Sequence, residues 1–426
     1  MADLLDELSE EEDQAVFRLL HGPQRVRAFE YLDRAVQRRI LTALPDDDAA
    51  SLLNGMAADD RTALLEDLDE PDRERALRLL SDKARAVAEQ LLEYPEESVG
   101  RLMTTSLVSV RPHWTIAHAL DHIRRHGQDS ETLNVLYVVD AEDKLVDDLR
   151  IRQVLLAAPN QTIQSLMDGA FVVLLADAPK RSAVEVFQRY DRSALPVVDA
   201  EGRLLGVVTI DDVLDVAEQA ATEDIQKFGG MEALSEPYAS TPILTMVRKR
   251  GVWLVVLFLG EMLTATAMGY YEHQIAQAVV LALFVPLIIS SGGNSGSQAA
   301  TLIVRALAVG DVQLRDWPQV LGRELLSGAL LGVLLGAIGF ARIALWSAFT
   351  DVYGPHWTLV GATVGLSLVG IVLWGAVAGS MLPFALKRLG LDPATSSAPF
   401  VATLVDVTGL IIYFTVATIV LRGTLL

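Results

Sequence analysis

The sequence predicts an α-helical membrane protein with five transmembrane helices per subunit, preceded by an all-α domain and a pair of α+β domains. Residues 252–422 are mostly apolar segments, each long enough to cross a hydrocarbon core of about 30 Å. Only eight of the 55 acidic and ten of the 35 basic residues lie from Thr241 onward, so the preceding region carries about −22 and the remainder about +2. Such a negative field attracts cations and repels nucleic acid, so we expect no nucleic-acid partner.

Residues 1–97 are expected to form the all-α domain from short amphipathic helices, for example over 11–20 and 60–68. Apolar residues recur there at helical spacing, and prolines separate the segments. Most acids of this domain are expected to face solvent. Metal sensing by Asp59 or Asp60 is the alternative.

Residues 98–165 and 166–216 repeat one α+β pattern. Each unit contains a strand-like apolar run that ends in an aspartate, at 135–140 in the first and 194–199 in the second. The repeat resembles a tandem pair of CBS domains.

A nucleotide-binding signature of that family occurs once in the repeat. The second unit contains Gly206-x-x-Thr209-x-x-Asp212, which in CBS domains contacts a nucleotide ribose. The first unit has Arg150 and Gln153 where Ser or Thr and Asp are usual. The resemblance therefore implies ATP binding at most at the second unit.

The connecting segment 211–247 begins with an acidic helix that is expected to end near Gly229. At 100° per residue, Asp211, Asp215 and Glu218 share one face. Asp212 and Glu223 adjoin that face. Like charges at this spacing destabilise a helix by a few tenths of a kcal/mol per pair, and a shared divalent cation would relieve that cost. An ordinary solvent-facing acidic helix is the alternative.

Residues 248–426 are expected to form the membrane domain. The lysines and arginines cluster before the first span, between the second and third, and between the fourth and fifth. The positive-inside rule then predicts a multi-pass protein of the cell (inner) membrane with a cytoplasmic N-terminus. The expected spans are about 252–272, 275–306, 321–348, 358–386 and 398–421.

The second span contains glycines, serines, Asn294 and Gln298 between residues 286 and 298. Irregular polar backbone at membrane depth is tolerated only against protein or a water-filled path. We therefore expect this segment to interrupt its helix and to line a wet passage. The alternative is close helix packing through small residues.

Two acids lie inside the predicted spans. A carboxylate there costs at least about 2.5–3.5 kcal/mol, so Asp406 is expected to face a cavity. At 1.5 Å per residue, Asp406 and Asn294 lie roughly 12 and 17 Å from the inner ends of their spans, and so at similar depth. Glu261 is interpreted as a pore residue, a proton or Na⁺ site, or a protonated acid that bonds a neighbouring helix.

Composition restricts the chemistry further. There is no cysteine, and the seven histidines show no spacing typical of a metal site. A bound metal would then be held by carboxylates, carbonyls and water, which suits Mg²⁺, Ca²⁺ or Mn²⁺. The sequence contains no nucleophile–base pairing or phosphate-loop motif, so we do not expect an enzyme.

Several motifs together resemble the MgtE family of magnesium channels. They are Gly100-Arg-Leu-Met-Thr104, the acidic helix Asp212-Val-Leu-Asp-Val-Ala-Glu218, Arg315-Asp-Trp, the segment 286–298 and Leu-Val-Asp406-Val-Thr-Gly-Leu. The resemblance covers essentially the whole chain. It implies a homodimer in the lipid bilayer that imports Mg²⁺ and is closed by high cytosolic Mg²⁺.

The resemblance also implies roles for particular residues. Asp406 would be the selectivity acid, working with the Ala402 carbonyl. The regulatory acids would be Asp191, Asp212, Asp215, Glu223 and Asp224, with Asp392 near the cytoplasmic mouth.

This sequence departs from a well-studied form of the pattern at three positions. Ala220 replaces an acid, Ala398 replaces an asparagine, and Glu261 is additional. Glu261 keeps open an exchange of Mg²⁺ for Na⁺ or H⁺. A membrane-anchored nucleotide sensor is a further alternative, although an anchor would need neither Asp406 nor the polar second span.

Overall fold

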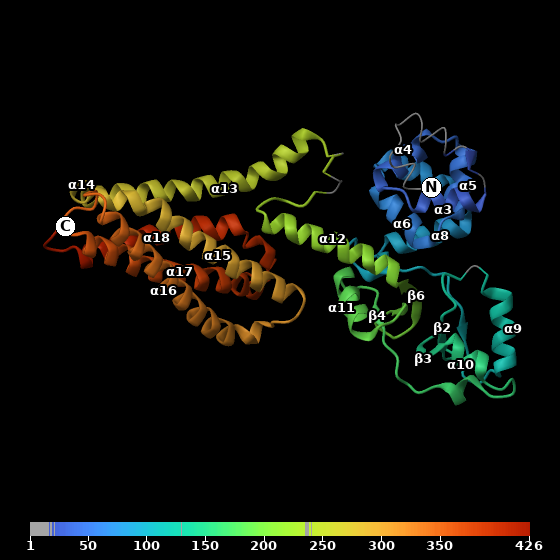
Figure 1. Ribbon diagram of the computed structural model, residues 1–426. Helices are drawn as coiled ribbons and strands as arrows, with labels where there is room; N and C mark the ends of the chain where they lie inside the picture. The colour runs from blue at the N-terminus through green and yellow to red at the C-terminus, as the bar shows by residue number, and fades with distance from the viewer. Residues whose placement is uncertain (1–16, 18, 21, 129, 235–237, 240) are drawn as a thin grey trace. The chain divides into compact units, whose positions relative to one another are not determined.

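The computed structural model describes residues 17, 19–20, 22–128, 130–234, 238–239 and 241–426 (Figure 1). It forms two compact units, Met1–Ala220 and Ala221–Leu426. Most of the helix predicted over 11–20 lies outside the described residues. The predicted fold class is confirmed, since a helical domain, two small mixed sheets and five long apolar helices follow in the expected order.

The first part of unit 1 is a stack of short helices. Each helix packs against the next but one, and their apolar faces bury Phe29, Leu52, Leu53, Leu64 and Leu65. This stacking explains the repeated helical spacing of apolar residues in the sequence. The helices are α3 (Pro23–Glu30), α4 (Arg34–Ala43), α5 (Asp46–Gly55), α6 (Ala58–Asp67), α7 (Glu70–Leu79) and α8 (Asp82–Leu92).

The two α+β units have the same topology. In each, a short strand pairs in parallel with a central strand, and the central strand pairs antiparallel with a third. Both central strands are buried along their whole length, which explains their uninterrupted apolar sequence. The first unit contains β1 (Ser109–Val110), α9 (Ile116–His126), β2 (Val135–Val139), β3 (Leu145–Arg150) and α10 (Ile151–Leu156). The second contains β4 (Leu174–Leu175), α11 (Lys180–Tyr190), β5 (Ala194–Val198) and β6 (Leu204–Thr209), followed directly by α12 (Ile210–Phe228).

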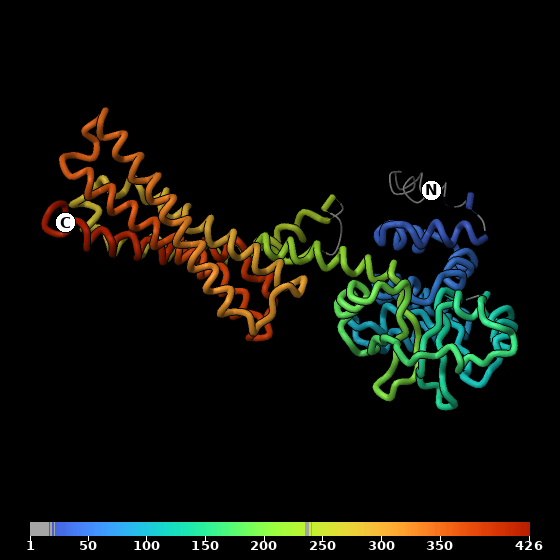
Figure 2. Tube along the Cα trace, turned by 60° about the horizontal axis from the view of Figure 1, so that its bottom comes forward, coloured from blue at the N-terminus to red at the C-terminus, as the bar shows by residue number. Residues whose placement is uncertain are grey.

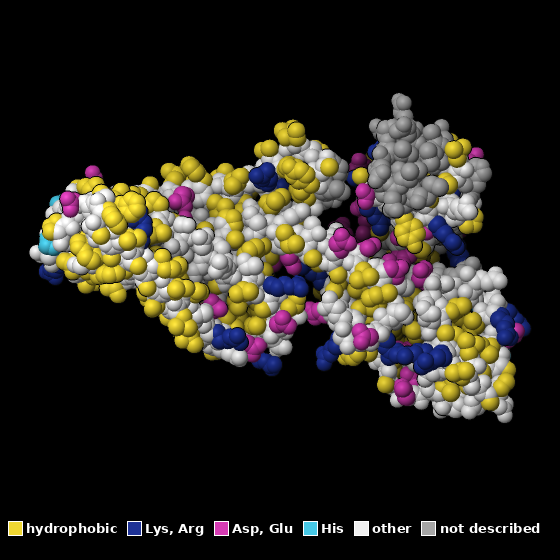
Figure 3. Space-filling view, viewed as in Figure 1, with side chains coloured by type: hydrophobic (Ala, Val, Ile, Leu, Met, Phe, Trp, Pro, Cys, Tyr) yellow, Lys and Arg dark blue, Asp and Glu magenta, His cyan; other side chains and the backbone are white. Residues whose placement is uncertain are grey.

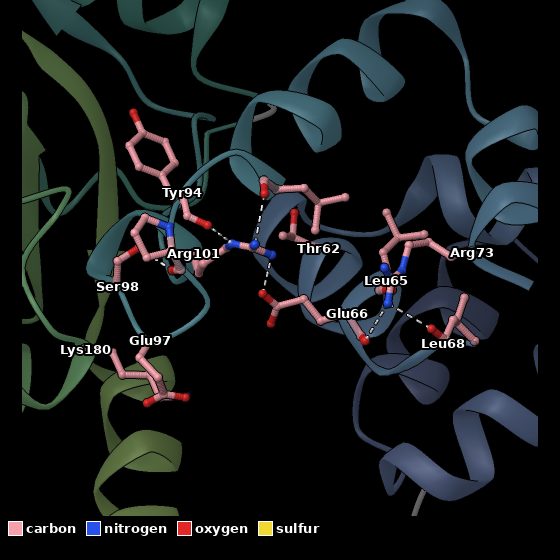
Figure 4. A network of polar contacts seen from close by, with 12 residues as sticks. Thr62, Leu65, Glu66, Leu68, Arg73, Tyr94, Glu97, Ser98, Arg101 and Lys180 are labelled. Atoms are coloured by element: carbon pink, nitrogen blue, oxygen red, sulfur yellow. Dashed lines mark hydrogen bonds and ion pairs between the residues drawn. The ribbon is translucent and has the colours of Figure 1, made fainter. Parts of the chain in front are cut away.

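Arg101 fastens the helical stack to the α+β part of unit 1 (Figure 4). Its guanidinium donates to the Tyr94 carbonyl at 2.6 Å and the Leu92 carbonyl at 2.9 Å, and it pairs with Glu66 on α6. Only 11% of the Arg101 side chain is exposed, so these are buried, charge-assisted bonds. They fix the position of α6, which carries Asp59 and Asp60.

Unit 2 contains the five helices that are long and apolar enough to cross a membrane. Helix α17 packs against α15, α16 and α18, whereas α13 packs mainly against α18 (Figure 2). Apolar side chains cover much of the surface of this unit in Figure 3, as expected for helices that face lipid. The helices are α13 (Ile243–Tyr270), α15 (Val285–Ala308), α16 (Trp317–Ser347), α17 (Trp357–Arg388) and α18 (Ala398–Val420), with the short α14 (Glu272–Gln277) between α13 and α15.

The expected interruption of the second span is wrong. Residues 286–298 belong to the continuous helix α15, and the irregular backbone lies before it, in the 3₁₀ segment Val279–Phe284. Gly292 and Gly296 are buried, and a Cβ on Gly379 of α17 would overlap the Gly296 carbonyl. The glycines therefore allow helix backbones to touch, which is the packing alternative.

Candidate intramembrane carboxylate site and acidic cluster

Asp406 lies on α18 opposite a glycine of α15. A Cβ built on Gly293 would lie 3.5 Å from Asp406 Oδ1 and 3.4 Å from the Cβ of Ala402. Asp406 is partly exposed, whereas Val405 beside it is fully buried. The absence of a side chain at Gly293 thus leaves space beside the carboxylate, and the two spans meet at the similar depth that their lengths predict.

Asn294 follows Gly293 and is exposed on α15. Its Nδ2 donates to Ser290 Oγ at 3.4 Å, one turn earlier. Ser297, on the next turn, donates to the Ala398 carbonyl at 3.2 Å. A polar strip of α15 therefore runs along the start of α18 toward Asp406.

Glu261 on α13 lies close enough to Asp406 for their charges to interact. The two helices touch nearby, since a Cβ on Gly260 would lie 2.9 Å from the Thr403 methyl. Glu261 itself is exposed in the single chain. Two of the three interpretations from sequence, a pore residue and an ion or proton site, need this proximity to Asp406.

Asp392 is held by two partners at the start of the short 3₁₀ segment Pro393–Thr395, which precedes α18. Its Oδ1 accepts from the Ala394 amide at 2.9 Å, and its Oδ2 pairs with Lys227 Nζ at 3.1 Å. Lys227 also pairs with Glu223, one turn earlier on α12, at 3.5 Å. The sequence analysis missed Lys227, because no local pattern links residues so far apart in the chain.

A separate group of carboxylates gathers in unit 1, where α6 and α12 contribute two and three acids. Helix α3 and the loop before β2 each add one more. Burial, together with the charges of neighbouring acids, raises the pKa values of six of these acids: Glu30, Asp59, Asp60, Glu131, Asp212 and Asp215. We call this group the acidic cluster; its members are Glu30, Asp59, Asp60, Glu131, Asp211, Asp212 and Asp215.

Asp59 is the most buried member of the acidic cluster. Only 8% of the residue is exposed, and its Oδ1 has no hydrogen-bond partner among the described residues. Burial, then the charges of Asp212, Asp60 and Glu131, raise its pKa well above the usual range. A buried carboxylate oxygen without a partner is costly, so this position fits a cation or a proton.

Asp212 shows the same conflict in milder form. Burial raises its pKa to about 7, although a 2.7 Å hydrogen bond from Thr209 Oγ1 acts in the opposite direction. Burial also raises the pKa values of Asp60 and Asp215, and in both cases the Arg34 guanidinium partly offsets it. Arg27 acts on Glu30 and Arg61 on Asp59 in the same way, so the seven acids of the acidic cluster face three arginines and hold more negative charge than these balance.

The other predicted regulatory acids lie apart from this centre. Glu218 is exposed one turn beyond Asp215 and helps to raise the pKa of Asp215. Asp191 ends α11 in a left-handed conformation, with φ of 47°. Glu223 and Asp224 lie further along α12, in unit 2.

The acidic cluster is suited to a hydrated ion. Within the described ranges, no three acidic or histidine side chains converge closely enough to hold a metal directly. Mg²⁺ dehydrates reluctantly and often reaches carboxylates through its water shell. Sequence spacing identified the α12 members, whereas Glu30 and Glu131 join only through the tertiary fold.

Family models match most of the chain. The divalent cation transporter model of MgtE matches residues 285–416, the MgtE intracellular N domain matches 1–97, and CBS domains match 99–160 and 163–218.

Named relatives match along much of their length. The chain is 40% identical to the magnesium transporter MgtE of Thermus thermophilus over 80% of this chain and 73% of that protein. It is 30% identical to the Enterococcus faecalis magnesium transporter MgtE over 78% and 71% of the two chains. A crystal structure of the cytosolic domain of the Mg²⁺ channel MgtE in complex with ATP matches half of this chain and 93% of its own, at 31% identity and a TM-score of 0.39.

These matches bear out the predicted resemblance and the prediction that the chain is a transporter rather than an enzyme. The protein belongs to the MgtE family of divalent cation transporters.

Proposed function

We propose that the protein imports Mg²⁺ across the cell membrane along a path that passes Asp406. The observation that carries this proposal is the position of Asp406, a carboxylate in an apolar helix bundle that faces a glycine of the neighbouring span. An intramembrane acid is costly unless it serves an ion or a proton. The names of the relatives, magnesium transporters, agree with this ion.

The membrane potential supplies the driving force for import. It contributes about 2.3 kcal/mol per charge per 100 mV, and so twice that for a divalent ion. Because Mg²⁺ loses water reluctantly, the ion passes Asp406 with most of its hydration shell. Gly293 and Ala402 keep larger side chains away from the carboxylate of Asp406 on this side.

Cytosolic Mg²⁺ closes this path by binding the acidic cluster. Bound Mg²⁺ offsets the repulsion around Asp59 and Asp212, so the arrangement observed here is the one that high Mg²⁺ favours. A swing from mostly open to mostly closed needs about 5.5 kcal/mol of differential binding, which several weak sites supply together.

Helix α12 is the element that transmits this change. Its first half carries three members of the acidic cluster, and its second half carries Lys227, the partner of Asp392. A helix is stiff, so a movement of α12 caused by a change of charge at Asp212 and Asp215 also displaces Lys227. The remaining predicted regulatory acids, Asp191, Glu218, Glu223 and Asp224, contribute additional weak binding.

Orientation and assembly complete the proposal. The placement of lysines and arginines puts the N-terminal unit in the cytoplasm. Helix α13 leaves Phe258, Leu259 and Met262 more than half exposed and packs mainly on one neighbour. We assign part of this face to a second copy of the chain, which makes the working unit a homodimer.

Uptake of Mg²⁺ into proteoliposomes tests the pathway. We expect Asp406→Asn to abolish uptake, because an amide keeps the shape but not the charge. Glu324→Gln, at another partly buried acid on α16, is the matched control and should keep uptake near the wild-type rate. Equal losses in both variants would contradict the role of Asp406.

Exchange of Mg²⁺ for Na⁺ or H⁺ is a second candidate, favoured by the closeness of Glu261 to Asp406. Imposed Na⁺ and pH gradients distinguish the two mechanisms. A channel's Mg²⁺ flux should not reverse with either gradient, whereas an exchanger's flux should, and Glu261→Gln should remove that response.

Nucleotide binding stays a prediction for the second α+β unit. Thr209 already donates to Asp212 within the chain, so ATP would have to bind beside this pair or replace the bond. A titration with ATP, wild type against Thr209→Val, checks this and also addresses the nucleotide-sensor alternative.

A further inference from the structure

Helix α9 carries a row of histidines that transport does not use. His118, His122 and His126 are spaced by four residues, which places them on one face of the helix. The sequence analysis found no metal-ligand spacing among the histidines. Among the described residues no group of three ligating side chains could hold a metal, which agrees with that result. The sequence analysis nevertheless overlooked pairs of histidines one turn apart on this face.

The ring geometry matches a two-histidine chelate. The ring centres of His122 and His126 lie 4.6 Å apart. Two imidazoles bound to one ion at about 2.0–2.1 Å, at an angle between square and tetrahedral, have ring centres roughly 4.5–5.2 Å apart. The separation of the two rings therefore already suits one shared ion.

The surroundings keep the pair available as ligands. Trp114 packs its indole against His118 and His122, with ring centres 4.7 and 4.9 Å apart, which restrains both side chains. Partial burial, then the neighbouring histidines and Arg125, lowers the pKa of His122.

Nearby charges act in both directions. Arg125 pairs with Asp121, which offsets part of its repulsion of a cation. The carbonyl end of α9 lies at His126, where the helix dipole favours positive charge. Arg124 is the remaining positive charge in the last turn of the helix.

We propose that His122 and His126 chelate one divalent transition-metal ion of the imidazole-preferring class, such as Ni²⁺, Cu²⁺ or Zn²⁺. Water completes the coordination sphere, and His118 lies one turn away as a further ligand. Mg²⁺ does not compete, because it prefers oxygen ligands, whereas imidazole suits the later first-row metals. The site is thus chemically separate from Asp406 and from the acidic cluster.

Trp114 provides a direct reporter. It is the only tryptophan among residues 1–252 and contacts two of the three histidines, so Ni²⁺ or Cu²⁺ bound there should quench its emission. The experiment titrates Ni²⁺ into the full-length protein in detergent, without a polyhistidine tag. A large excess of Mg²⁺ over Ni²⁺ is present, so that the carboxylate sites are occupied by Mg²⁺. We expect saturable quenching, one ion per chain by calorimetry, and displacement by Zn²⁺.

Substitutions locate the ion. His122→Gln and His126→Gln should each lower Ni²⁺ affinity by more than the 10–100-fold typical of a lost outer-shell partner, because each removes a ligand. His113→Gln is the matched control, since His113 also contacts Trp114 but precedes the helix. Trp114→Phe should remove the quenching and keep the calorimetric binding.

Two results would overturn the site. One is Ni²⁺ binding that survives His122→Gln and His126→Gln combined. The other is an equal loss of affinity in His113→Gln. All four positions lie in or beside one partly exposed helix, and an unchanged thermal unfolding midpoint verifies that each variant is folded.

Discussion

The two carboxylate sites of this protein differ in the number of acids they contain and in how closely those acids are packed. Asp406 is one acid among small and apolar residues, with space beside it and Glu261 as its acidic neighbour. The acidic cluster places seven acids near three arginines, Arg27, Arg34 and Arg61, and burial raises several of the acids' pKa values. A single acid with room suits an ion that passes, whereas crowded acids suit an ion that binds and holds elements together. The predictions below test this division, beginning with the largest effect.

The close contact of α15 and α17 should be the least tolerant feature of the membrane unit. A Cβ on Gly379 would overlap the Gly296 carbonyl, whereas one on Gly322 of α16 meets nothing within 4 Å. We expect Gly379→Ala to cost about 1–3 kcal/mol or more, as overpacking does. Gly322→Ala, the same change in an open helical position, should instead stabilise the protein by up to about 1 kcal/mol, because alanine favours a helix more than glycine does. Thermal unfolding in detergent measures both, and equal midpoints would refute the packing interpretation.

Stabilisation by Mg²⁺ should grow with pH. The native pKa values of Asp59 and Asp212 are raised above those of the unfolded chain, with Asp212 at about 7. Between about pH 4 and 7 the native state therefore binds more protons, and its unfolding free energy falls as pH rises. Mg²⁺ binds the charged form, so its stabilising effect should be small at pH 5.5 and large at pH 8.

At pH 8 and roughly 100 times its Kd, Mg²⁺ should stabilise the protein by about 2.7 kcal/mol. Differential scanning fluorimetry at both pH values measures this effect. In Asp212→Asn the dependence on pH should weaken. A larger Mg²⁺ effect at pH 5.5 than at pH 8 would show that carboxylates with raised pKa values are not the ligands.

Removal of Lys227 should have the smallest effect on stability. The Lys227 and Asp392 side chains are 30% and 36% exposed, so their ion pair contributes only about 0–1 kcal/mol. Lys227→Met should instead change the inner Mg²⁺ concentration that halves uptake, because it releases Asp392. Lys83→Met, on α8 of unit 1, is the control. An unchanged half-inhibition would remove Lys227 from the gating pathway.

Local patterns predicted much of this structure. Apolar length marked the spans, strand-like runs marked the two α+β units, and helical spacing marked the acids of α12. The predictions were wrong where the local structure depended on contacts with residues distant in the sequence. Glycines and polar residues at membrane depth indicated irregular backbone, so residues 286–298 were predicted to interrupt their helix. The compensating contacts come from Gly375 and Gly379, which are more than 75 residues further along the chain.

The candidate sites show the same limit. The spacing of Asp211 and Asp215 placed them together, and spacing could also have revealed His118, His122 and His126. No local pattern assigns Glu30 or Glu131 to the acidic cluster, or Lys227 to Asp392, because tertiary packing alone brings them there. Burial of Asp59 was equally invisible, since an acid in the first turn of an amphipathic helix is usually solvated.

The separation of permeation from sensing is tested most directly by Mg²⁺ uptake at a series of inner Mg²⁺ concentrations in the Asp59→Asn/Asp212→Asn double variant. We predict wild-type uptake at low inner Mg²⁺ and loss of inhibition at high inner Mg²⁺, because Asp406 is intact and the acidic cluster is neutralised at its buried centre. An inhibition curve that superimposes on that of the wild type would contradict the account.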